Sequence, residues 1–238
     1  MTESVKKLKE WVDGAHSIVF FGGAGVSTES GIPDFRSTGG LYHQEWSDPP
    51  EVILSHSYYK SNPEEFFRFY RAKLLAPEAK PNDAHRKLAE WERQGKLEAV
   101  VTQNIDGLHQ AAGSRRVYEL HGSVHRNYCE KCRKFYGLDF MLQSRGVPRC
   151  SCGGAVKPDV VLYEEGLDQD TLNGAVRAIA AADLLIIGGT SLNVYPAAGL
   201  INYYRGQRLA LINKSAVARD LDAGVVITDP IGEVLAQM

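Results

Sequence analysis

The sequence has little net charge, no long apolar run and no apolar leader, and each of these absences excludes a class of protein. Its formal net charge of −2 does not supply the overall basic surface with which a protein binds nucleic acid or anionic lipid. No apolar run approaches the roughly 20 residues that cross a bilayer. The N-terminus up to Leu8 is polar where a signal peptide needs its apolar stretch. We therefore expect a cytoplasmic protein without membrane contact.

Cysteine is scarce as well, and all of it lies in one short segment: Cys129, Cys132, Cys150 and Cys152. In a reducing compartment such a cluster is typical of a metal site rather than of two disulfides. Four thiolates close a tetrahedral shell, so we expect one structural zinc ion per chain. The second pair has a shorter spacer than is common, and Gly153 and Gly154 allow the backbone there to adjust. With no cysteine left elsewhere, cysteine nucleophilic catalysis is excluded.

Short apolar runs alternate with helical patterns along the chain, at residues 17–21, 99–102, 183–187, 208–212 and 225–228. Strands that are buried on both faces have this near-continuous apolar character. The pattern predicts an α/β protein with a Rossmann-like, doubly wound parallel sheet. At 238 residues, the chain can form one such core with a small appended module.

Helical periodicity is clearest at 63–75 and 84–94, and Val5, Leu8 and Val12 mark one face of an N-terminal helix. Two stretches interrupt the α/β alternation, one rich in proline and aromatic residues and the other containing the cysteines. We expect a single catalytic domain of residues 1–238, with the parts that follow. They are a core of about 1–33, 80–121 and 157–238, a helical and cofactor-loop insertion of about 34–79, and a zinc module of about 122–156.

A glycine-rich turn, Gly22-Gly23-Ala24-Gly25, directly follows the first predicted strand. Glycine at this place lets the backbone approach a pyrophosphate, and a following helix N-terminus offers N–H donors. The usual dinucleotide fingerprint is incomplete, because Thr28 stands where its third glycine would fall. A plain tight turn remains the alternative interpretation.

Polar residues end the second predicted strand, in the order Thr102-Gln103-Asn104-Ile105-Asp106-Gly107-Leu108-His109. Buried amides and carboxylates need partners, so packing alone does not explain this choice. Capping of the next helix, which Asp106 alone could provide, is the alternative.

A histidine, His121, stands before Gly122 at the boundary between the predicted core and the cysteine segment. A lone histidine is more often structural than catalytic, and that role remains the alternative. The unperturbed pKa of about 6.5 leaves a histidine largely neutral near physiological pH, which would suit a general base. The remaining histidines have no comparable context and are expected to be structural or solvent-facing: His16, His43, His56, His85, His109 and His125.

These motifs together resemble the sirtuin family, over about Val5 to Leu235. Residues 23–36 resemble the signature in which a glycine turn leads into a loop over the cofactor, and 102–109 resemble the second motif. The resemblance implies an NAD-dependent protein lysine deacetylase, which transfers the acetyl group to ADP-ribose and releases nicotinamide. Its co-substrate would be NAD, and its partners would be acetylated lysine-containing proteins or peptides.

The resemblance also implies roles for individual residues. His121 would be the general base, with Asn104 as the second catalytic residue. Phe35 would screen the reactive face, and Arg36 would orient or neutralise the phosphates. Ile105 and Asp106 would hold the nicotinamide carboxamide. The further cofactor-binding residues would be Gly23, Ala24, Gly25, Thr28, Gln103, Thr190, Ser191, Asn213 and Ile231.

The peptide substrate would be held by Val160, Val161 and Tyr163. At Tyr163-Glu164-Glu165 the chain departs from the family, which usually has aromatic-Gly-Glu there. The helical pair Phe67 and Tyr70 would form an aromatic wall at the acyl tip, which favours acetyl over succinyl groups. These expectations define the substrate side of the site.

Other functions remain as alternatives. A sirtuin fold could act as an ADP-ribosyltransferase or remove longer acyl groups. A nicotinamide oxidoreductase would also have a glycine turn. We find neither its third glycine nor, about 20 positions after the turn, the acidic residue that binds the adenosine ribose. Arg126, Lys131, Arg133 and Lys134 make the cysteine segment locally basic, as in a zinc-dependent nucleic-acid binder, yet no stacking platform is evident.

Overall fold

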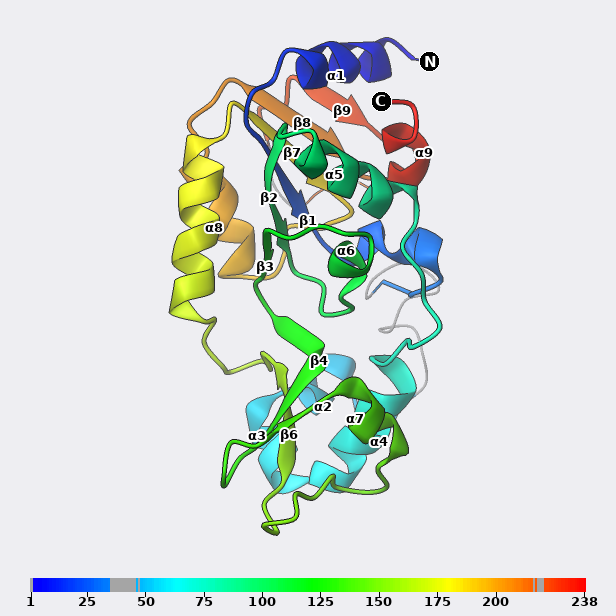
Figure 1. The fold of residues 1–238 in the computed structure, drawn as a ribbon, viewed down its shortest axis with the longest axis vertical. Helices are drawn as coiled ribbons and strands as arrows, with labels where there is room; N and C mark the ends of the chain where they lie inside the picture. The colour runs from blue at the N-terminus through cyan, green and yellow to red at the C-terminus, as the bar shows by residue number, and fades with distance from the viewer. Residues whose placement is uncertain (1, 35–45, 47, 216, 218–220) are drawn as a thin grey trace.

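The structure is a computed structural model that describes residues 2–34, 46, 48–215, 217 and 221–238. Phe35 and Arg36, both predicted to act on the cofactor, lie outside these residues. The described chain forms an upper lobe around a sheet and a lower lobe of short helices and strands (Figure 1).

A parallel sheet of six strands, in the order β3-β2-β1-β7-β8-β9, forms the upper lobe. The strands are β1 (Ile18–Gly22), β2 (Leu97–Thr102), β3 (Val117–Glu119), β7 (Leu184–Gly188), β8 (Arg208–Ile212) and β9 (Val225–Ile227). All the predicted strands are present, and their order confirms the Rossmann-like, doubly wound fold. The edge strand β3 was not predicted, because its three half-buried residues form no continuous apolar run.

Side chains of β1 alternate between two cores, one on each face of the sheet. Ile18 and Phe20 pack on one face, against α1 (Glu3–Asp13), α5 (Asp83–Arg93) and α9 (Ile231–Leu235). Val19 and Phe21 pack on the other face, against α8 (Gln169–Ala181) and the 3₁₀ helix η4 (Ala197–Tyr203). Because both faces are covered, a β1 side chain is apolar whichever way it points.

The predicted helices are confirmed. In α1, Val5, Leu8 and Val12 form the buried face. Helix α5 begins with a capping box. The Asn82 side chain accepts from backbone N–H groups, and the His85 side chain accepts from the Asn82 N–H. No helix in the described part of the chain combines the length and apolar composition that a membrane crossing requires.

The lower lobe contains α2 (Pro50–Ile53), α3 (His56–Ser61), α4 (Pro63–Lys73), α7 (Leu138–Gln143) and an antiparallel sheet in the order β5-β4-β6. Its strands are β4 (Gly122–Cys129), β5 (Phe135–Tyr136) and β6 (Val156–Val160). One hydrophobic cluster joins Phe66 and Phe67 of α4 to Cys129 and Val156 of the cysteine segment. The helical insertion and the cysteine segment therefore share a core.

The order of the strands reverses at β1. The chain proceeds from β1 to β2 on one side, and later places β7 on the other side. The carboxyl ends of these three strands meet at the edge that faces the lower lobe in Figure 1. Ligands of doubly wound proteins bind at such a topological switch point. Short helices follow β1 and β2 there: η1 (Ala24–Val26), η2 (Thr28–Ser30) and α6 (Leu108–Ala111).

Candidate active site

The glycine turn after β1 packs directly against the turn after β7. The Gly25 N–H donates to the Gly189 carbonyl oxygen over 2.8 Å. A Cβ atom on Gly25 would lie 2.7 Å from the Gly189 Cα, and one on Gly23 would lie 2.9 Å from the Gly189 oxygen. Any larger residue would push the two turns apart. The plain tight turn and the ligand-binding turn are thus compatible, since the same glycines bring two predicted cofactor segments together.

The motif after β2 reaches the same place. The Gln103 Nε2 donates to the Thr190 Oγ1 over 3.0 Å, and the Thr190 Oγ1 also accepts from the Leu192 N–H over 3.2 Å. Residues from β1, β2 and β7 that are far apart in the sequence therefore form one cluster at the switch point. Ser191 lies in the same turn as Thr190.

A small hydrogen-bond network connects the glycine turn to the β2 motif. One Asp106 carboxylate oxygen accepts from the Ser27 hydroxyl over 2.7 Å, and the other accepts from the Leu108 N–H over 2.9 Å. The Asn104 Nδ2 donates to the Ser27 Oγ over 3.1 Å. Asp106 therefore binds the first N–H group of α6 from the position before its N-cap, close to the alternative interpretation, and also joins the site. Ser27, which is 1 % exposed, is not among the predicted site residues, although it lies two positions after the glycine turn.

His121 lies where the chain crosses between the lobes. Its Nδ1 lies 3.0 Å from the Gln103 carbonyl oxygen. A carbonyl oxygen only accepts, so Nδ1 carries the hydrogen and the lone pair is on Nε2. Burial lowers the pKa of His121 below its usual value, and the hydrogen bond to Gln103 opposes this shift. The imidazole is therefore neutral near physiological pH and can accept a proton at Nε2.

Two of the histidines expected to be structural are buried behind this cluster. The His85 and His109 rings have centroids 4.7 Å apart. Burial lowers the pKa of His85 to about 4 and the pKa of His109 well below its usual value. Both imidazoles are therefore neutral parts of the core and not proton donors at the site.

The residues predicted to bind adenosine lie at the same sheet edge, beyond β7. Asn213 follows β8, where its N–H donates to the Ile227 carbonyl oxygen over 2.9 Å. Ile231 begins α9 and is buried. Glu29 of η2 accepts from the Gly232 N–H over 2.8 Å, which ties the start of α9 to the glycine turn. The Thr28 hydroxyl donates to the Gly25 carbonyl oxygen over 3.0 Å, which makes the same turn more rigid.

The predicted peptide segment emerges from β6, beside His121. The Val161 N–H donates to the His121 carbonyl oxygen over 3.0 Å. Tyr163 pairs with Ser55 in a parallel bridge and is 38 % exposed. Val160 itself is buried. The segment is thereby fixed between the general-base candidate and the lower lobe.

Phe67 and Tyr70 do share one face of α4, with ring centroids 6.4 Å apart. Both side chains are fully enclosed, at 0 % exposure, in the core of the lower lobe. The structure therefore does not present the open aromatic wall that the sequence predicts. The reason is that Phe66 and Tyr59 pack against the same rings.

The four cysteines converge as a metal site requires. Their sulfur atoms all lie within 4.8 Å of one another. The Sγ of Cys129 lies 3.5 Å from that of Cys152, and the Sγ of Cys132 lies 3.6 Å from that of Cys150. Sulfurs of a tetrahedral zinc site are about 3.8 Å apart, given Zn–S bonds of about 2.3 Å. The residues present therefore fit a zinc ion.

The short spacer of the second cysteine pair is accommodated by the glycines that follow it. Gly153 has φ +83, a left-handed conformation, and a Cβ on Gly154 would lie 2.7 Å from the Cys129 Sγ. The Cys150 N–H closes the loop by donating to the Gly154 carbonyl oxygen over 2.9 Å. Glycine at both positions lets a one-residue spacer bring both sulfurs inward.

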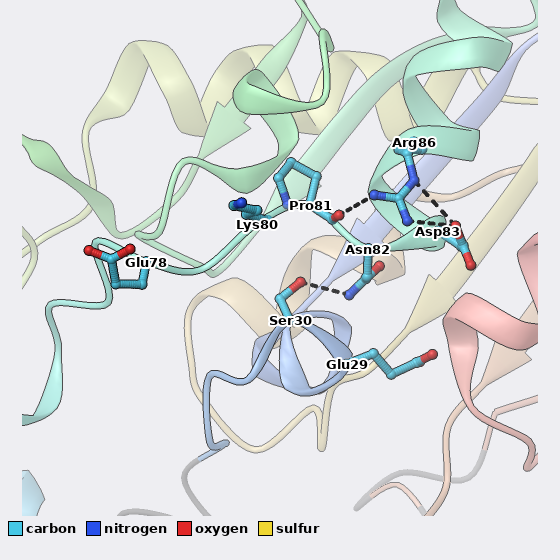
Figure 2. Close-up of a pocket in the computed structure, with 8 residues that line it drawn as sticks. All are labelled: Glu29, Ser30, Glu78, Lys80, Pro81, Asn82, Asp83 and Arg86. Atoms are coloured by element: carbon cyan, nitrogen blue, oxygen red, sulfur yellow. Dashed lines mark hydrogen bonds and ion pairs between the residues drawn. The ribbon is translucent and has the colours of Figure 1, made fainter.

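A separate polar cavity of about 420 Å³ lies between η2 and the start of α5 (Figure 2). Asn82 donates to the Ser30 Oγ over 3.0 Å, and Arg86 binds Asp83 over 2.7 Å, along its wall (Figure 2). None of the described residues predicted for the site lines this cavity. Acidic and basic side chains are mixed there, which indicates no single class of ligand.

Comparison with known proteins agrees with this geometry. The model of the Sir2 family matches residues 23–196. A Clostridium perfringens protein named NAD-dependent protein deacetylase is 61 % identical, with 100 % of this chain and 99 % of that protein covered. A solved Sir2 enzyme structure superposes with a TM-score of 0.90 at 40 % identity and covers 100 % of this chain and 96 % of its own. A Sir2 complex with p53 peptide and NAD⁺ gives a TM-score of 0.87 at 39 % identity, with 100 % and 97 % covered.

Proposed function

The chain belongs to the Sir2 family, and we propose that it is an NAD-dependent protein lysine deacetylase. One observation carries the proposal at the level of the site. The His121 imidazole is held by Gln103 with its Nε2 lone pair available, next to the cluster at the topological switch point. A buried, neutral base at a ligand-binding crevice is suited to remove a proton from a bound hydroxyl.

NAD supplies the ADP-ribose group that accepts the acetyl group, and nicotinamide is the leaving group. We propose that His121 accepts the proton of a ribose hydroxyl at Nε2. Gln103 and Asn104 contact the nicotinamide ribose, and their side-chain amides are oriented by hydrogen bonds to Thr190 and Ser27. Ile105 and Asp106 hold the nicotinamide carboxamide. A fixed polar environment of this kind stabilises developing charge without reorganisation.

The remaining cofactor residues are proposed from their positions. Gly23, Ala24 and Gly25 line the turn after β1, and Thr190 and Ser191 line the turn after β7. Asn213 follows β8 and Ile231 begins α9 after β9, and we propose that both contact the adenosine part. Phe35 and Arg36 complete the proposed set from outside the described residues. The assignment of these residues to the cofactor follows the rule that ligands of such folds bind at the carboxyl ends of the strands.

We also propose that the four cysteines hold one zinc ion with a structural role. The support is the arrangement of the sulfurs and the absence of a fifth protein ligand among the described residues of the cluster. A closed four-sulfur shell stabilises the local fold and offers no position for substrate. The segment about 122–156 and the insertion about 34–79 would then be parts of a single domain, since they share a core.

The proposed substrates are acetylated lysines in proteins or peptides, held by Val160, Val161 and Tyr163. Acetyl is proposed over succinyl because both arginines of α4 are engaged elsewhere. Arg68 binds Glu65 over 2.8 Å, and Arg71 donates to the Gly146 carbonyl oxygen over 2.8 Å. We place the protein in the cytoplasm, where four reduced cysteines can bind zinc.

The deciding experiment is incubation of the protein with NAD and an acetylated peptide. A deacetylase releases nicotinamide only when the peptide is present, and deacetylated peptide appears in equal amount. Label transferred from NAD to protein would instead indicate an ADP-ribosyltransferase. Formation of NADH would indicate an oxidoreductase, and no turnover of NAD would contradict the proposal.

A further inference from the structure

Strand β4 contains a bulge that lies against the back of the proposed nicotinamide site. Ser123 pairs with Asp159 of β6, and Asn127 pairs with Pro158, the neighbouring residue. The three residues 124–126 of β4 therefore lie opposite no residue of β6. Bulges of this kind redirect side chains and are common beside active sites.

Two bulge residues bind the turn that follows β2. The Val124 N–H donates to the Ile105 carbonyl oxygen over 3.0 Å. The His125 Nε2 lies 3.0 Å from the Asp106 carbonyl oxygen. Because a carbonyl oxygen only accepts, Nε2 carries the hydrogen and donates it. Consecutive carbonyl groups of the turn are thus held by consecutive residues of the bulge.

The third bulge residue anchors the bulge itself. Arg126 donates from Nε to Asp159 over 2.7 Å and from a terminal nitrogen to Glu119 over 2.6 Å. Glu119 belongs to β3 of the upper lobe and Asp159 to β6 of the lower lobe. Arg126 therefore ties the bulge to both lobes, so that His125 is presented from a fixed backbone.

The His125 ring fits closely over the turn. A Cβ on Gly107 would lie 2.7 Å from the His125 Cδ2 and 2.8 Å from its Nε2, and Gly107 has φ +72. Glycine therefore serves both the left-handed backbone and the approach of the ring. On the other side of the turn, the Asp106 carboxylate binds Ser27. The turn is held from two sides, by Ser27 and by His125.

We propose that His125 is a positioning residue for the nicotinamide site. The inference rests on the proposed function, in which Ile105 and Asp106 hold the carboxamide. His125 acts through the backbone of Asp106 and does not touch the cofactor. A site residue must be held within about 0.5 Å of its productive position by its surroundings, and a hydrogen bond to its own carbonyl group is such a support. From the sequence, His125 is expected only to be structural or solvent-facing, because a strand pattern gives no sign of a bulge.

The test compares three variants in the full-length zinc-containing protein. His125→Gln keeps an N–H donor at the distance of Nε2, whereas His125→Leu keeps a similar volume without a donor. His16→Ala, an exposed histidine before β1, is the matched control. Three quantities are measured for each variant: the inhibition constant of nicotinamide, the KM for NAD and the KM for the acetylated peptide. Thermal unfolding establishes that each variant is folded.

We expect His125→Leu to weaken nicotinamide inhibition and raise the KM for NAD by about 3- to 10-fold, the scale of one lost hydrogen bond. The peptide KM should stay within about twofold, because the turn does not belong to the peptide segment. His125→Gln should keep the nicotinamide inhibition constant and the KM for NAD close to their wild-type values. His16→Ala should match the wild type.

Unchanged nicotinamide inhibition in a folded His125→Leu variant would overturn the proposal, as would equal shifts in the peptide and nicotinamide constants. These outcomes differ from failure of the proposed function, in which the wild type itself releases no nicotinamide with peptide and NAD. That result would overturn both.

Discussion

The Nδ1 atom of His121 lies 3.0 Å from the carbonyl oxygen of Gln103, and this contact couples the proposed base to the motif proposed to hold the cofactor. Gln103 uses its side chain for Thr190 and its backbone carbonyl for His121. One residue thus binds the turn after β7 and also fixes which imidazole nitrogen carries the hydrogen. A neutral ring with its lone pair on Nε2 is the form that a general base requires.

Replacing His121 with alanine should lower deacetylation by at least about 100-fold, the usual scale of a lost acid–base group. The variant should still bind NAD, because the other cofactor residues are unchanged. Rates and NAD binding measured on the same folded preparation provide the check. Near-normal turnover would show that another group is the base.

The same assignment predicts the acidic limb of the pH profile. Burial lowers the pKa of His121, so its neutral form persists below the unperturbed value of about 6.5. Activity should therefore fall only as the pH drops through this lower value, and the limb should be absent from the residual rate of His121→Ala.

Replacing Cys129 with alanine should remove the zinc ion, lower solubility and abolish activity together. Cys129 is also a buried member of the hydrophobic cluster of the lower lobe, so loss of the site would loosen the packing around β4. Metal binding and local folding are coupled in such sites. Native mass spectrometry should find one zinc ion in the wild type and none in the variant. Full activity of a folded, metal-free protein would be incompatible with a structural ion.

Glu164 stands where the family usually has glycine, and its backbone is left-handed, with φ +76. Its carboxylate accepts from the Ser57 N–H and from the Ser57 hydroxyl, each over 2.9 Å. The strain of a non-glycine residue in this conformation is on the order of 1 kcal/mol. The hydrogen bonds offset it by a similar amount, about 1 kcal/mol, because the carboxylate is exposed.

Glu164→Ala should therefore destabilise the fold by about 1 kcal/mol, since it keeps the strain and loses the hydrogen bonds. Glu164→Gly should leave the free energy of unfolding nearly unchanged, because it removes both the backbone strain and the hydrogen bonds that offset it. Denaturant unfolding of both variants, with the exposed Glu10→Ala as the control, measures the difference. Equal stability of the alanine and glycine variants would show that the left-handed backbone costs nothing here.

The sequence predicts the upper lobe well, because buried parallel strands such as 184–188 are apolar at every position. Site segments are also predictable, since polar residues after a buried strand, such as Asn104, have no packing role. The remainder depends on contacts between distant segments. The bulge that presents His125, the packing of Gly25 on Gly189 and the joint core of α4 with Cys129 have no local signal. Phe67 and Tyr70 illustrate the limit, because periodicity places them on one face without showing that this face is closed.

The last prediction concerns the acyl group. Phe67 and Tyr70, which the sequence assigns to the acyl tip, are enclosed in the core of the lower lobe, and neither carries a charge. The arginines of this helix are committed elsewhere, Arg68 to Glu65 and Arg71 to Gly146 and Ser144. The Tyr70 hydroxyl is buried without a hydrogen-bond partner among the described residues, and burial raises its pKa, so it remains a neutral phenol. A succinyl carboxylate that approached this helix would have to lose its hydration without gaining an arginine partner, at a cost of several kcal/mol.

An acetyl group carries no such charge. We therefore expect kcat/KM for an acetylated peptide to exceed that for the succinylated form of the same peptide by at least about tenfold, which corresponds to 1.4 kcal/mol. Tyr70→Phe should leave this ratio almost unchanged, because the Tyr70 side chain is enclosed in the core and its hydroxyl carries no charge. Steady-state rates on the two matched peptides measure the ratio. Equal or better efficiency on the succinylated peptide would show that a cation does reach the acyl tip.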